Sequence, residues 1–197
     1  PEINLQHYIV DGGSNDSTLE IISRYQKVIL IKSKVKGLYK TIDSTLLDIN
    51  SKFIIYVHSD DYISINFIYE LYKTYKFNSG KIPVAKVNFI DANSNVLYSR
   101  IFPRLIKIFQ YQENLILHPN CLYPSILEKS YPYYYDVVQK ESNNLDWLHI
   151  NKLIRLGLKF IGCNEAIYYY RIHSKTITSR TIKSSENNQR GIISILS

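Results

Sequence analysis

Short apolar runs rich in β-branched residues alternate with segments of helical spacing through the first third of the chain, and this alternation limits the fold more than any other feature. We expect strands at 5–10, 28–31 and 53–57. After each strand, apolar residues recur at the spacing of an amphipathic helix. Strands that alternate with helices form a parallel sheet covered by helices on both faces. The sequence therefore predicts an α/β fold with a central, mostly parallel sheet.

The remainder of the chain is less regular. The other expected strands lie at 84–90, 95–101, 159–161 and 166–172. One short helix is expected at 124–130. Asp91-Ala92-Asn93 is a turn signal between the first two of these strands, which predicts a mixed or antiparallel edge. A longer helix is expected from Leu145 to about Leu156, where Gly157 supplies the left-handed residue that ends a helix. No linker or repeat interrupts the pattern, so we expect one domain over residues 1–197.

Composition excludes several classes of protein. The 197 residues are 45% apolar with 7 Gly and 6 Pro, which is a globular profile and not a disordered or collagen-like one. No apolar run approaches the roughly 20 residues that a membrane-spanning helix needs. Cys121 and Cys163 are too few for a disulfide scaffold and lack metal-site spacing, so we expect reduced thiols in the cytoplasm. The net charge of +7 favours anionic partners, such as nucleotides or acidic membrane surfaces, although a solvated basic surface explains it equally simply.

Acidic turns follow two of the expected strands, at the edge where open parallel sheets bind ligands. Asp11 ends the first strand, and the pair Asp60-Asp61 follows the third. A divalent cation that also binds substrate phosphates would neutralise the repulsion between adjacent carboxylates. A capping turn before the next helix is the alternative, and spacing alone favours it by about two to one. Asp11-Gly12-Gly13-Ser14 allows close approach to a ligand, yet it is neither a P-loop nor a dinucleotide fingerprint.

The segment around Asp11 resembles a known family. Residues 8–18, Tyr-Ile-Val-Asp-Gly-Gly-Ser-Asn-Asp-Ser-Thr, are similar to the nucleotide-binding segment of the family-2 glycosyltransferases, which have the GT-A fold. Residues 53–61 resemble the strand of that family that carries the metal-binding Asp-x-Asp-type motif. Three weaker similarities follow in the order that the family has them, at His118-Pro119-Asn120, Leu145-Asp146-Trp147 and Tyr170-Arg171-Ile172-His173. The resemblance covers nearly the whole chain.

The resemblance implies a role for each of these segments. The residues that it implies for nucleotide binding are Asp11, Gly12, Gly13, Ser14 and Asp60. Asp61 and His173 would hold Mn²⁺ or Mg²⁺, which neutralises charge on the departing diphosphate, and Arg171 would contact the diphosphate. Asp146 would be the catalytic base that deprotonates the acceptor hydroxyl in a single inverting displacement.

Several of these residues also have a purely structural interpretation. Asp146 lies in the first turn of an expected helix, where a carboxylate stabilises the helix dipole by about 0.3–1 kcal/mol. Arg171 and His173 alternate on a strand and share a face, but an arginine there is equally well a surface charge. His118 precedes a proline, and a lone histidine in that setting is more often structural.

The resemblance implies transfer of a sugar from a nucleotide-diphosphate-sugar, most commonly a UDP-sugar, to a glycan or lipid-linked acceptor. It places the protein in the cytoplasm, with peripheral contact at the inner face of the cytoplasmic membrane as a further expectation. No nucleic-acid recognition motif is found, so a nucleic-acid partner is not expected. The chain contains no methionine, and members of the family begin about one strand and helix earlier. We therefore expect a single glycosyltransferase domain that is truncated at its N-terminus.

Residues 35–43 depart from the family pattern. Many members carry an Asp-x-Gly-x-Tyr-Asp-Ala-x-Asn run that helps to position the donor. Gly37 and Tyr39 fit that run, whereas Val35, Lys40 and Asp43 do not. The alternative interpretation is therefore a divergent or inactive GT-A domain that only binds nucleotide or glycan.

Overall fold

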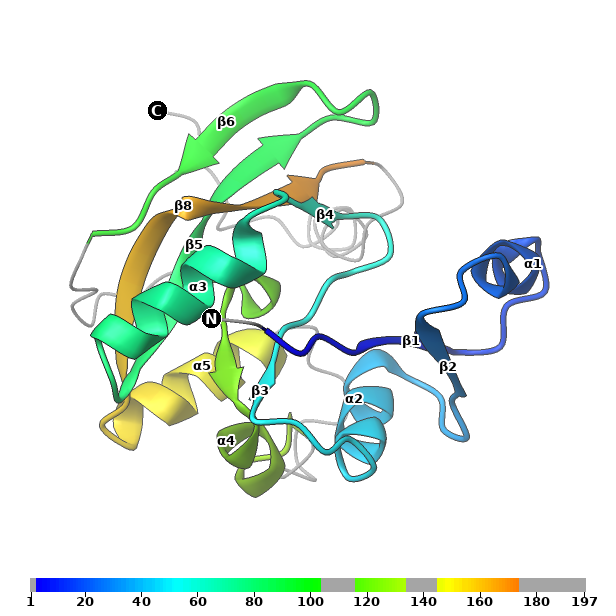
Figure 1. The fold of residues 1–197 in the computed structure, drawn as a ribbon, viewed down its shortest axis with the longest axis horizontal. Coiled ribbons are helices and arrows are strands. Elements are labelled where there is room, and N and C mark those ends of the chain that lie inside the picture. The colour runs from blue at the N-terminus through cyan, green and yellow to red at the C-terminus, as the bar shows by residue number, and fades with distance from the viewer. Residues whose placement is uncertain (1–2, 104–115, 134–144, 174–197) are drawn as a thin grey trace, which may run out of the picture.

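A computed structural model describes residues 3–103, 116–133 and 145–173 of the chain (Figure 1). The elements of the first segment are β1 (His7–Asp11), α1 (Thr18–Ser23), β2 (Val28–Lys32), α2 (Leu38–Leu46), β3 (Phe53–Ile54), β4 (Tyr62–Ile63), α3 (Phe67–Phe77), β5 (Lys81–Ile90) and β6 (Val96–Arg100). Those that follow are the 3₁₀ helix η2 (His118–Asn120), β7 (Tyr123–Pro124), α4 (Ser125–Ser130), α5 (Leu145–Arg155) and β8 (Lys159–Arg171). Apart from β4, η2 and β7, which the sequence does not predict, their order follows the expected strands and helices.

Three of the expected elements differ in extent. The strand expected at 53–57 is paired only over β3, because the chain leaves the ladder before the acidic turn. The helical spacing after the second strand predicts a helix from Leu38 to about Ile49, and this helix ends at Leu46. The strands expected at 159–161 and 166–172 are one strand, β8. Residues 164–166 have no partner in β5, and this irregularity interrupts the apolar pattern of a strand that is otherwise continuous.

Within the described residues the strands form separate hydrogen-bonded groups. β1 pairs with β2, β3 pairs with β7, and the largest sheet has the order β4-β8-β5-β6. The two longest ladders, β1–β2 and β5–β8, are parallel. The shorter pairings β3–β7, β4–β8 and β5–β6 are antiparallel. The expected parallel sheet is present in its long ladders, and the expected antiparallel edge is the β5–β6 hairpin.

The four-stranded sheet is covered on both faces. On one face α5 contributes Ile150, Leu153 and Ile154 to a core cluster with β5 and β8. On the other face Phe67 and Leu71 of α3 pack in a second cluster that includes Tyr168 of β8. This sheet with α3 and α5 is called the body below. The helices on its two faces are those that the alternating pattern predicts, and none of the described helices is long and apolar enough to cross a bilayer.

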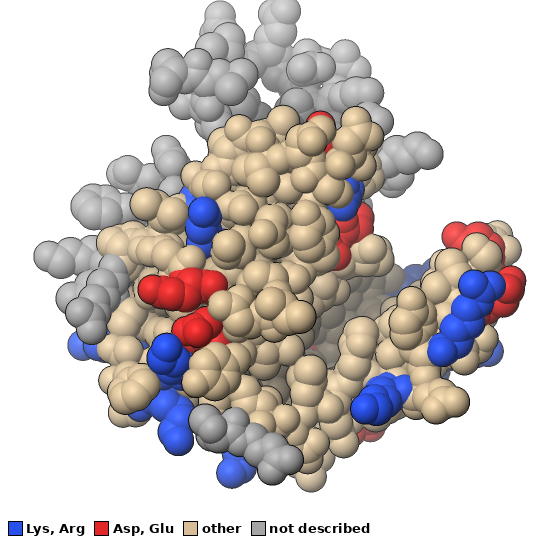
Figure 2. Space-filling view, turned by 45° about the horizontal axis from the view of Figure 1, so that its top comes forward, with Lys and Arg blue, Asp and Glu red and all other residues tan. Residues whose placement is uncertain are grey.

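The elements β1, α1 and β2, residues 7–32, form a lobe that projects from the body (Figure 1). Asp11 and Ile22 are its only buried residues. Ile29 and Leu30 of β2 are 42% and 38% exposed, so the β1–β2 pair gains little from burial. Figure 2 shows that the surface is hollowed between the lobe and the body.

Candidate active site

Asp11 ends β1, and the turn that follows holds its carboxylate. The carboxylate accepts hydrogen bonds from the backbone N–H groups of Gly13 (3.1 Å) and Ser14 (3.0 Å) and from the hydroxyl of Ser14. Gly13 has a φ of 105°, a conformation that glycine adopts at little cost. The hydroxyl of Ser14, followed by its backbone N–H, holds the pKa of Asp11 below its usual value. The carboxylate is therefore ionised at neutral pH and can accept a further hydrogen bond.

Asp61 follows β3 and is buried against β8. Its side chain is 1% exposed and accepts hydrogen bonds from the Tyr168 hydroxyl (2.7 Å) and the Arg171 backbone N–H (2.8 Å). His58 Nδ1 lies 3.9 Å from the same carboxylate. Burial raises the pKa of Asp61, although the hydrogen bonds from the Arg171 backbone N–H and the Tyr168 hydroxyl oppose this effect. The acidic turn is thus fixed by residues that are more than 100 positions away in the chain.

Asp60 and His173 form a more accessible pair beside Asp61. His173 Nε2 lies 3.2 Å from Asp60 Oδ2, and the two side chains are 29% and 38% exposed respectively. A carboxylate and an imidazole are ligands that a divalent cation accepts. Among the described residues no three His, Cys, Asp or Glu side chains are grouped to hold an ion. The pair therefore fits a cation only if substrate phosphate oxygens supply further ligands.

The guanidinium of Arg171 ties the β5–β6 turn to the acidic pair. Its Nε donates a hydrogen bond to the carbonyl of Asp60 (2.9 Å). One terminal nitrogen donates to the carbonyls of Asp91 (2.8 Å) and Ala92 (3.1 Å), and the other donates to the hydroxyl of Ser94 (3.1 Å). The structure therefore gives Arg171 a role in fixing the acidic turn, beside the diphosphate contact that the sequence predicts.

Asp146 lies in the first turn of α5. Its Oδ1 accepts a hydrogen bond from the Trp147 backbone N–H (2.8 Å). Burial, followed by the negative charge of Asp146, raises the pKa of Tyr39 of α2, so Tyr39 lies against this carboxylate. Tyr39 also interacts electrostatically with Tyr170. Tyr39 therefore connects α2 to the Asp146 carboxylate.

The predicted site residues fall into two groups. In the body, Asp60, Asp61, Arg171 and His173 are in contact with one another. Asp146 lies against Tyr39 of α2. Gly12 to Ser14 and Asp11 lie in the lobe, where the described hydrogen bonds of the Asp11 carboxylate stay within its own turn. The hollow shown in Figure 2 lies between these two parts of the molecule.

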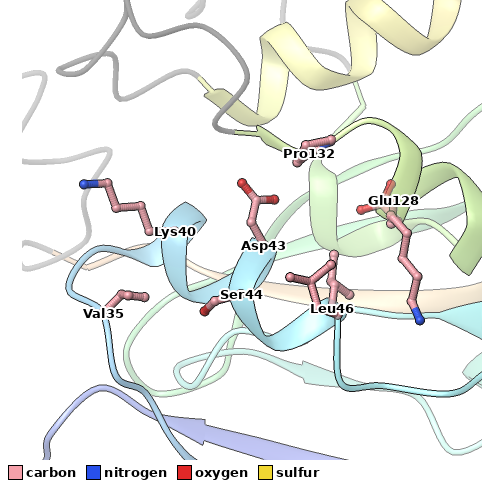
Figure 3. Close-up of a pocket in the computed structure, with 9 residues that line it drawn as sticks. Val35, Lys40, Asp43, Ser44, Leu46, Glu128 and Pro132 are labelled. Carbon is pink, nitrogen blue, oxygen red and sulfur yellow. The ribbon is translucent and has the colours of Figure 1, made fainter.

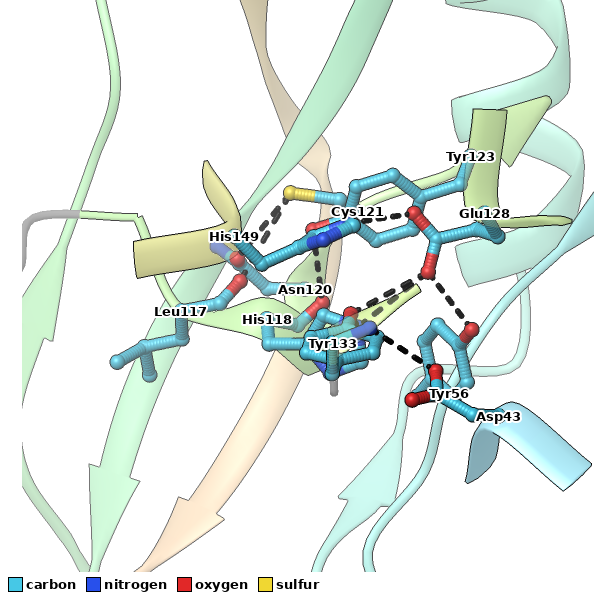
Figure 4. Close-up of polar contacts among 10 residues, drawn as sticks. All are labelled: Asp43, Tyr56, Leu117, His118, Asn120, Cys121, Tyr123, Glu128, Tyr133 and His149. Carbon is cyan, nitrogen blue, oxygen red and sulfur yellow. Dashed lines mark hydrogen bonds and ion pairs between the residues drawn. The ribbon is translucent and has the colours of Figure 1, made fainter. Parts of the chain in front are cut away.

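Sequence reasoning missed a buried polar cluster around Glu128 (Figure 4). Glu128 of α4 is 0% exposed and contacts His149, Tyr56 and Tyr133. His118, which the sequence singles out only weakly, is bonded to the Tyr133 hydroxyl. The available signal was that His149 lies three residues after Asp146, directly before the apolar positions Ile150, Leu153 and Ile154 of α5. A histidine on the apolar face of a helix needs a polar partner.

A pocket of about 360 Å³ lies between α2 and α4 (Figure 3). The residues that line it are Val35, Lys40, Asp43, Ser44, Leu46, Leu47, Glu128, Lys129 and Pro132. It borders the buried cluster through Glu128. Three positions of the divergent run, Val35, Lys40 and Asp43, lie on its wall. The departures from the family pattern thus lie on the wall of one pocket, which neither Asp60 nor Asp61 lines.

Solved structures with the same arrangement of elements come from S. aureus. TarS 1–349 in complex with UDP matches with a TM-score of 0.64 and 19% identity, over 85% of this chain and 51% of that one. The same protein in complex with UDP-GlcNAc matches with a TM-score of 0.62 and 17% identity, over 87% and 51%. These matches define the class: the chain has the GT-A glycosyltransferase fold. It spans about half the length of these TarS structures.

The family within this class follows from the sequence itself. Residues 1–130 match the family model described as Glycosyl transferase family 2, so the chain belongs to that family. A search of curated protein sequences gave no match. The resemblance seen at residues 8–18 and 53–61 is therefore confirmed, and the two acidic turns of the site lie in the matched part of the chain.

Proposed function

We propose that this chain is a catalytic domain that transfers a sugar from a UDP-sugar to a glycan or lipid-linked acceptor hydroxyl. One observation carries the proposal: the acidic pair after β3 meets Arg171 and His173 at the end of β8, in a chain of glycosyltransferase family 2. TarS structures that hold UDP and UDP-GlcNAc share the fold, which supports a UDP-sugar donor. A lipid-linked acceptor would bring the protein to the inner face of the cytoplasmic membrane.

In this proposal the lobe binds the nucleoside. The ionised carboxylate of Asp11 accepts a hydrogen bond from the base, since the low pKa of Asp11 keeps it an acceptor at neutral pH. Gly12 and Gly13 are exposed and add no side chain between the backbone and the ligand. Ser14 keeps the carboxylate in one orientation. Asp60 contributes to nucleotide binding from the body.

The body binds the diphosphate. Asp60 and His173 are the accessible ligands for Mn²⁺ or Mg²⁺, with Asp61 behind them. When bound, such a cation neutralises the charge of the departing diphosphate. Arg171 holds the turn in place through the carbonyl of Asp60 and adds positive charge beside the diphosphate. The backbone of the acidic turn is thus preorganised before a donor arrives.

Asp146 is the proposed base. The acceptor oxygen attacks the anomeric carbon, the bond from that carbon to the diphosphate oxygen breaks, and the electron pair leaves with UDP. The proton of the acceptor hydroxyl passes to the Asp146 carboxylate. The first turn of α5 favours the ionised form of this carboxylate, so it can accept a proton.

The alternative is a divergent domain that binds nucleotide or glycan without transfer. The departures at Val35, Lys40 and Asp43 favour it, because they line one pocket wall together. In that case calorimetry would show UDP binding, yet no donor in a panel of UDP-sugars would release UDP. Measuring UDP binding and UDP release together therefore distinguishes a transferase from a domain that only binds nucleotide.

The first test is Asp146→Asn, assayed as UDP release from UDP-GlcNAc and other UDP-sugars. We expect turnover to fall by about 10²-fold or more, with little change in the UDP dissociation constant, because only proton transfer is lost. Excess chelator should abolish turnover of the parent protein. Asp48→Asn, the same change at an exposed carboxyl after α2, is the control. Parent-like turnover of Asp146→Asn would leave Asp146 as a helix-end residue only.

A further inference from the structure

Glu128 is a buried carboxylate that the proposed reaction does not use directly. Its Oε1 lies 2.9 Å from His149 Nε2 of α5. Its Oε2 accepts hydrogen bonds from the hydroxyls of Tyr56 (2.7 Å) and Tyr133 (3.2 Å). Figure 4 shows these side chains converging on the carboxylate from α4, α5 and the segment after β3. One side chain thus joins several elements that are far apart in the sequence.

Tyr133 is held by contacts on several sides. Its ring stacks on His149, with ring centroids 4.1 Å apart, and on Tyr39, with centroids 5.4 Å apart. Its backbone N–H donates a hydrogen bond to Asp43 Oδ1 of α2 (3.0 Å), and its hydroxyl contacts His118 Nε2 as well as Glu128. Tyr133 therefore transmits the position of Glu128 to Tyr39.

Two routes lead from Glu128 to Asp146. In the first, His149 lies three residues after Asp146, about one turn along α5, so the pair of Glu128 and His149 fixes the start of the helix. In the second, Tyr133 packs on Tyr39, and Tyr39 lies against the Asp146 carboxylate. Both routes end at the same side chain.

Burying the Glu128 carboxylate lowers the stability of the fold, and apolar side chains could fill the same space without this cost. A buried carboxylate loses its hydration, and apolar residues of similar volume often replace a buried ion pair at no loss. The donors around Glu128 offset that cost and give the contacts a defined geometry. Burial also lowers the pKa of His118, which keeps its imidazole neutral beside the Tyr133 hydroxyl. Such an arrangement suits a site that needs one fixed conformation.

We propose that Glu128 is a positioning residue for Asp146: it fixes the first turn of α5 through His149 and fixes Tyr39 through Tyr133. This inference rests on the proposed function, in which Asp146 is the base. A displacement of a reacting group by about 1 Å is enough to lower a rate by about 10²-fold. A small displacement of the side chains around Glu128 should therefore lower turnover more than it weakens nucleotide binding.

Trp147 provides a readout that needs no activity. It is the single tryptophan of the 197 residues, and it follows Asp146 directly in α5. We expect Glu128→Gln to increase the acrylamide quenching of Trp147 fluorescence by about 2-fold and to lower kcat by about 10-fold, with the UDP dissociation constant unchanged. Glu165→Gln, the same change at an exposed carboxyl, should match the parent in all three measurements.

The outcomes separate the inference from the proposed function. A folded Glu128→Gln protein with parent-like quenching, or with increased quenching and parent-like kcat, overturns the positioning role. If circular dichroism shows that Glu128→Gln does not fold, Tyr133→Phe replaces it under the same criteria, because that change removes only a hydroxyl. If the parent turns over no donor, the proposed function fails, and quenching alone decides whether Glu128 holds α5.

Discussion

Asp11 in the lobe and Asp61 in the body both follow a strand, but different parts of the chain hold them. The carboxylate of Asp11 is bonded to Gly13 and Ser14, at most three residues away. The carboxylate of Asp61 is bonded to Tyr168 and Arg171, more than 100 residues away. The pKa of Asp11 is lowered by these bonds, whereas the pKa of Asp61 is raised by burial. The two sides of the site thus depend on different kinds of interaction.

This difference extends to the surroundings of each residue. In the lobe few residues are buried, and its strands pair only with each other among the described strands. In the body, Asp61 is bonded to Tyr168 and Arg171 of β8, and Tyr168 is a buried member of the core cluster with α3. We infer that the lobe keeps the geometry of Asp11 through a local turn, while the acidic pair depends on the whole body being folded.

Two glycines provide the sharpest way to break this comparison. A Cβ at Gly162 of β8 would lie 2.5 Å from the carbonyl oxygen of Phe102 and 2.7 Å from that of Pro103. Gly162→Ala should therefore lower the free energy of unfolding by about 3 kcal/mol. A Cβ at Gly12 in the lobe would meet no atom within 4 Å. Gly12→Ala should therefore change the free energy of unfolding by less than about 0.5 kcal/mol. Urea denaturation measures both, and equal losses would contradict the division into a packed body and an open lobe.

Removing one hydroxyl in the body and one in the lobe tests the same comparison with smaller changes in stability. The Tyr168 hydroxyl donates to Asp61 and accepts a hydrogen bond from the His58 backbone N–H (3.2 Å) in a side chain that is 0% exposed. Tyr168→Phe should lower the free energy of unfolding by about 1–2 kcal/mol, since Asp61 stays buried without this donor. Ser14→Ala should have a smaller effect, because the backbone N–H of Ser14 still reaches Asp11. Thermal melts of the two variants would rank them, and a larger loss in Ser14→Ala would reverse our interpretation.

The smallest expected effects are opposite dependences on pH in metal-free protein. The pKa of Asp11 is below its unfolded value of 3.8, so its contribution to stability is present above pH 3.8 and is lost as pH falls. The folded pKa of Asp61 is above 3.8, so the folded protein binds the extra proton and stability decreases as pH rises through that window.

Urea denaturation between about pH 2.5 and 7, with chelator present, tests both signs. Asp11→Asn should flatten the acid-side loss of stability, and Asp61→Asn should flatten the decrease above pH 3.8. Variants that change the profile in the same direction would contradict the assignment of opposite pKa shifts.

The sequence predicted the locally determined half of this site. The turn at Asp11 follows from a strand end, two glycines and a serine, all within four residues, so a motif can reveal it. The strand and helix order follows from apolar periodicity for the same reason. The environment of Asp61 was beyond prediction, because Tyr168 reaches it through pairing of β4 with β8.

The roles of Arg171 and Glu128 were also beyond prediction from the sequence. The sequence predicts that Arg171 contacts a diphosphate, but it holds no sign of the carbonyls of Asp91 and Ala92 that the guanidinium bonds. Glu128 looks like an ordinary helix glutamate until α4 packs against His149 of α5. The roles of both depend on tertiary contacts, which one sequence without its fold does not reveal.

The irregularity in β8 sets how far that strand extends. Residues 164–166 lie between two halves of the β5–β8 ladder without partners in β5. A regular strand advances about 3.3 Å per residue, so these positions absorb about 10 Å of length. As a result Arg171 pairs with Ile90, beside the hairpin turn that it holds. A ladder that kept the register of Lys81 with Lys159 throughout would instead place Arg171 three positions beyond Ile90, past the strand end, although neither residue would itself have changed.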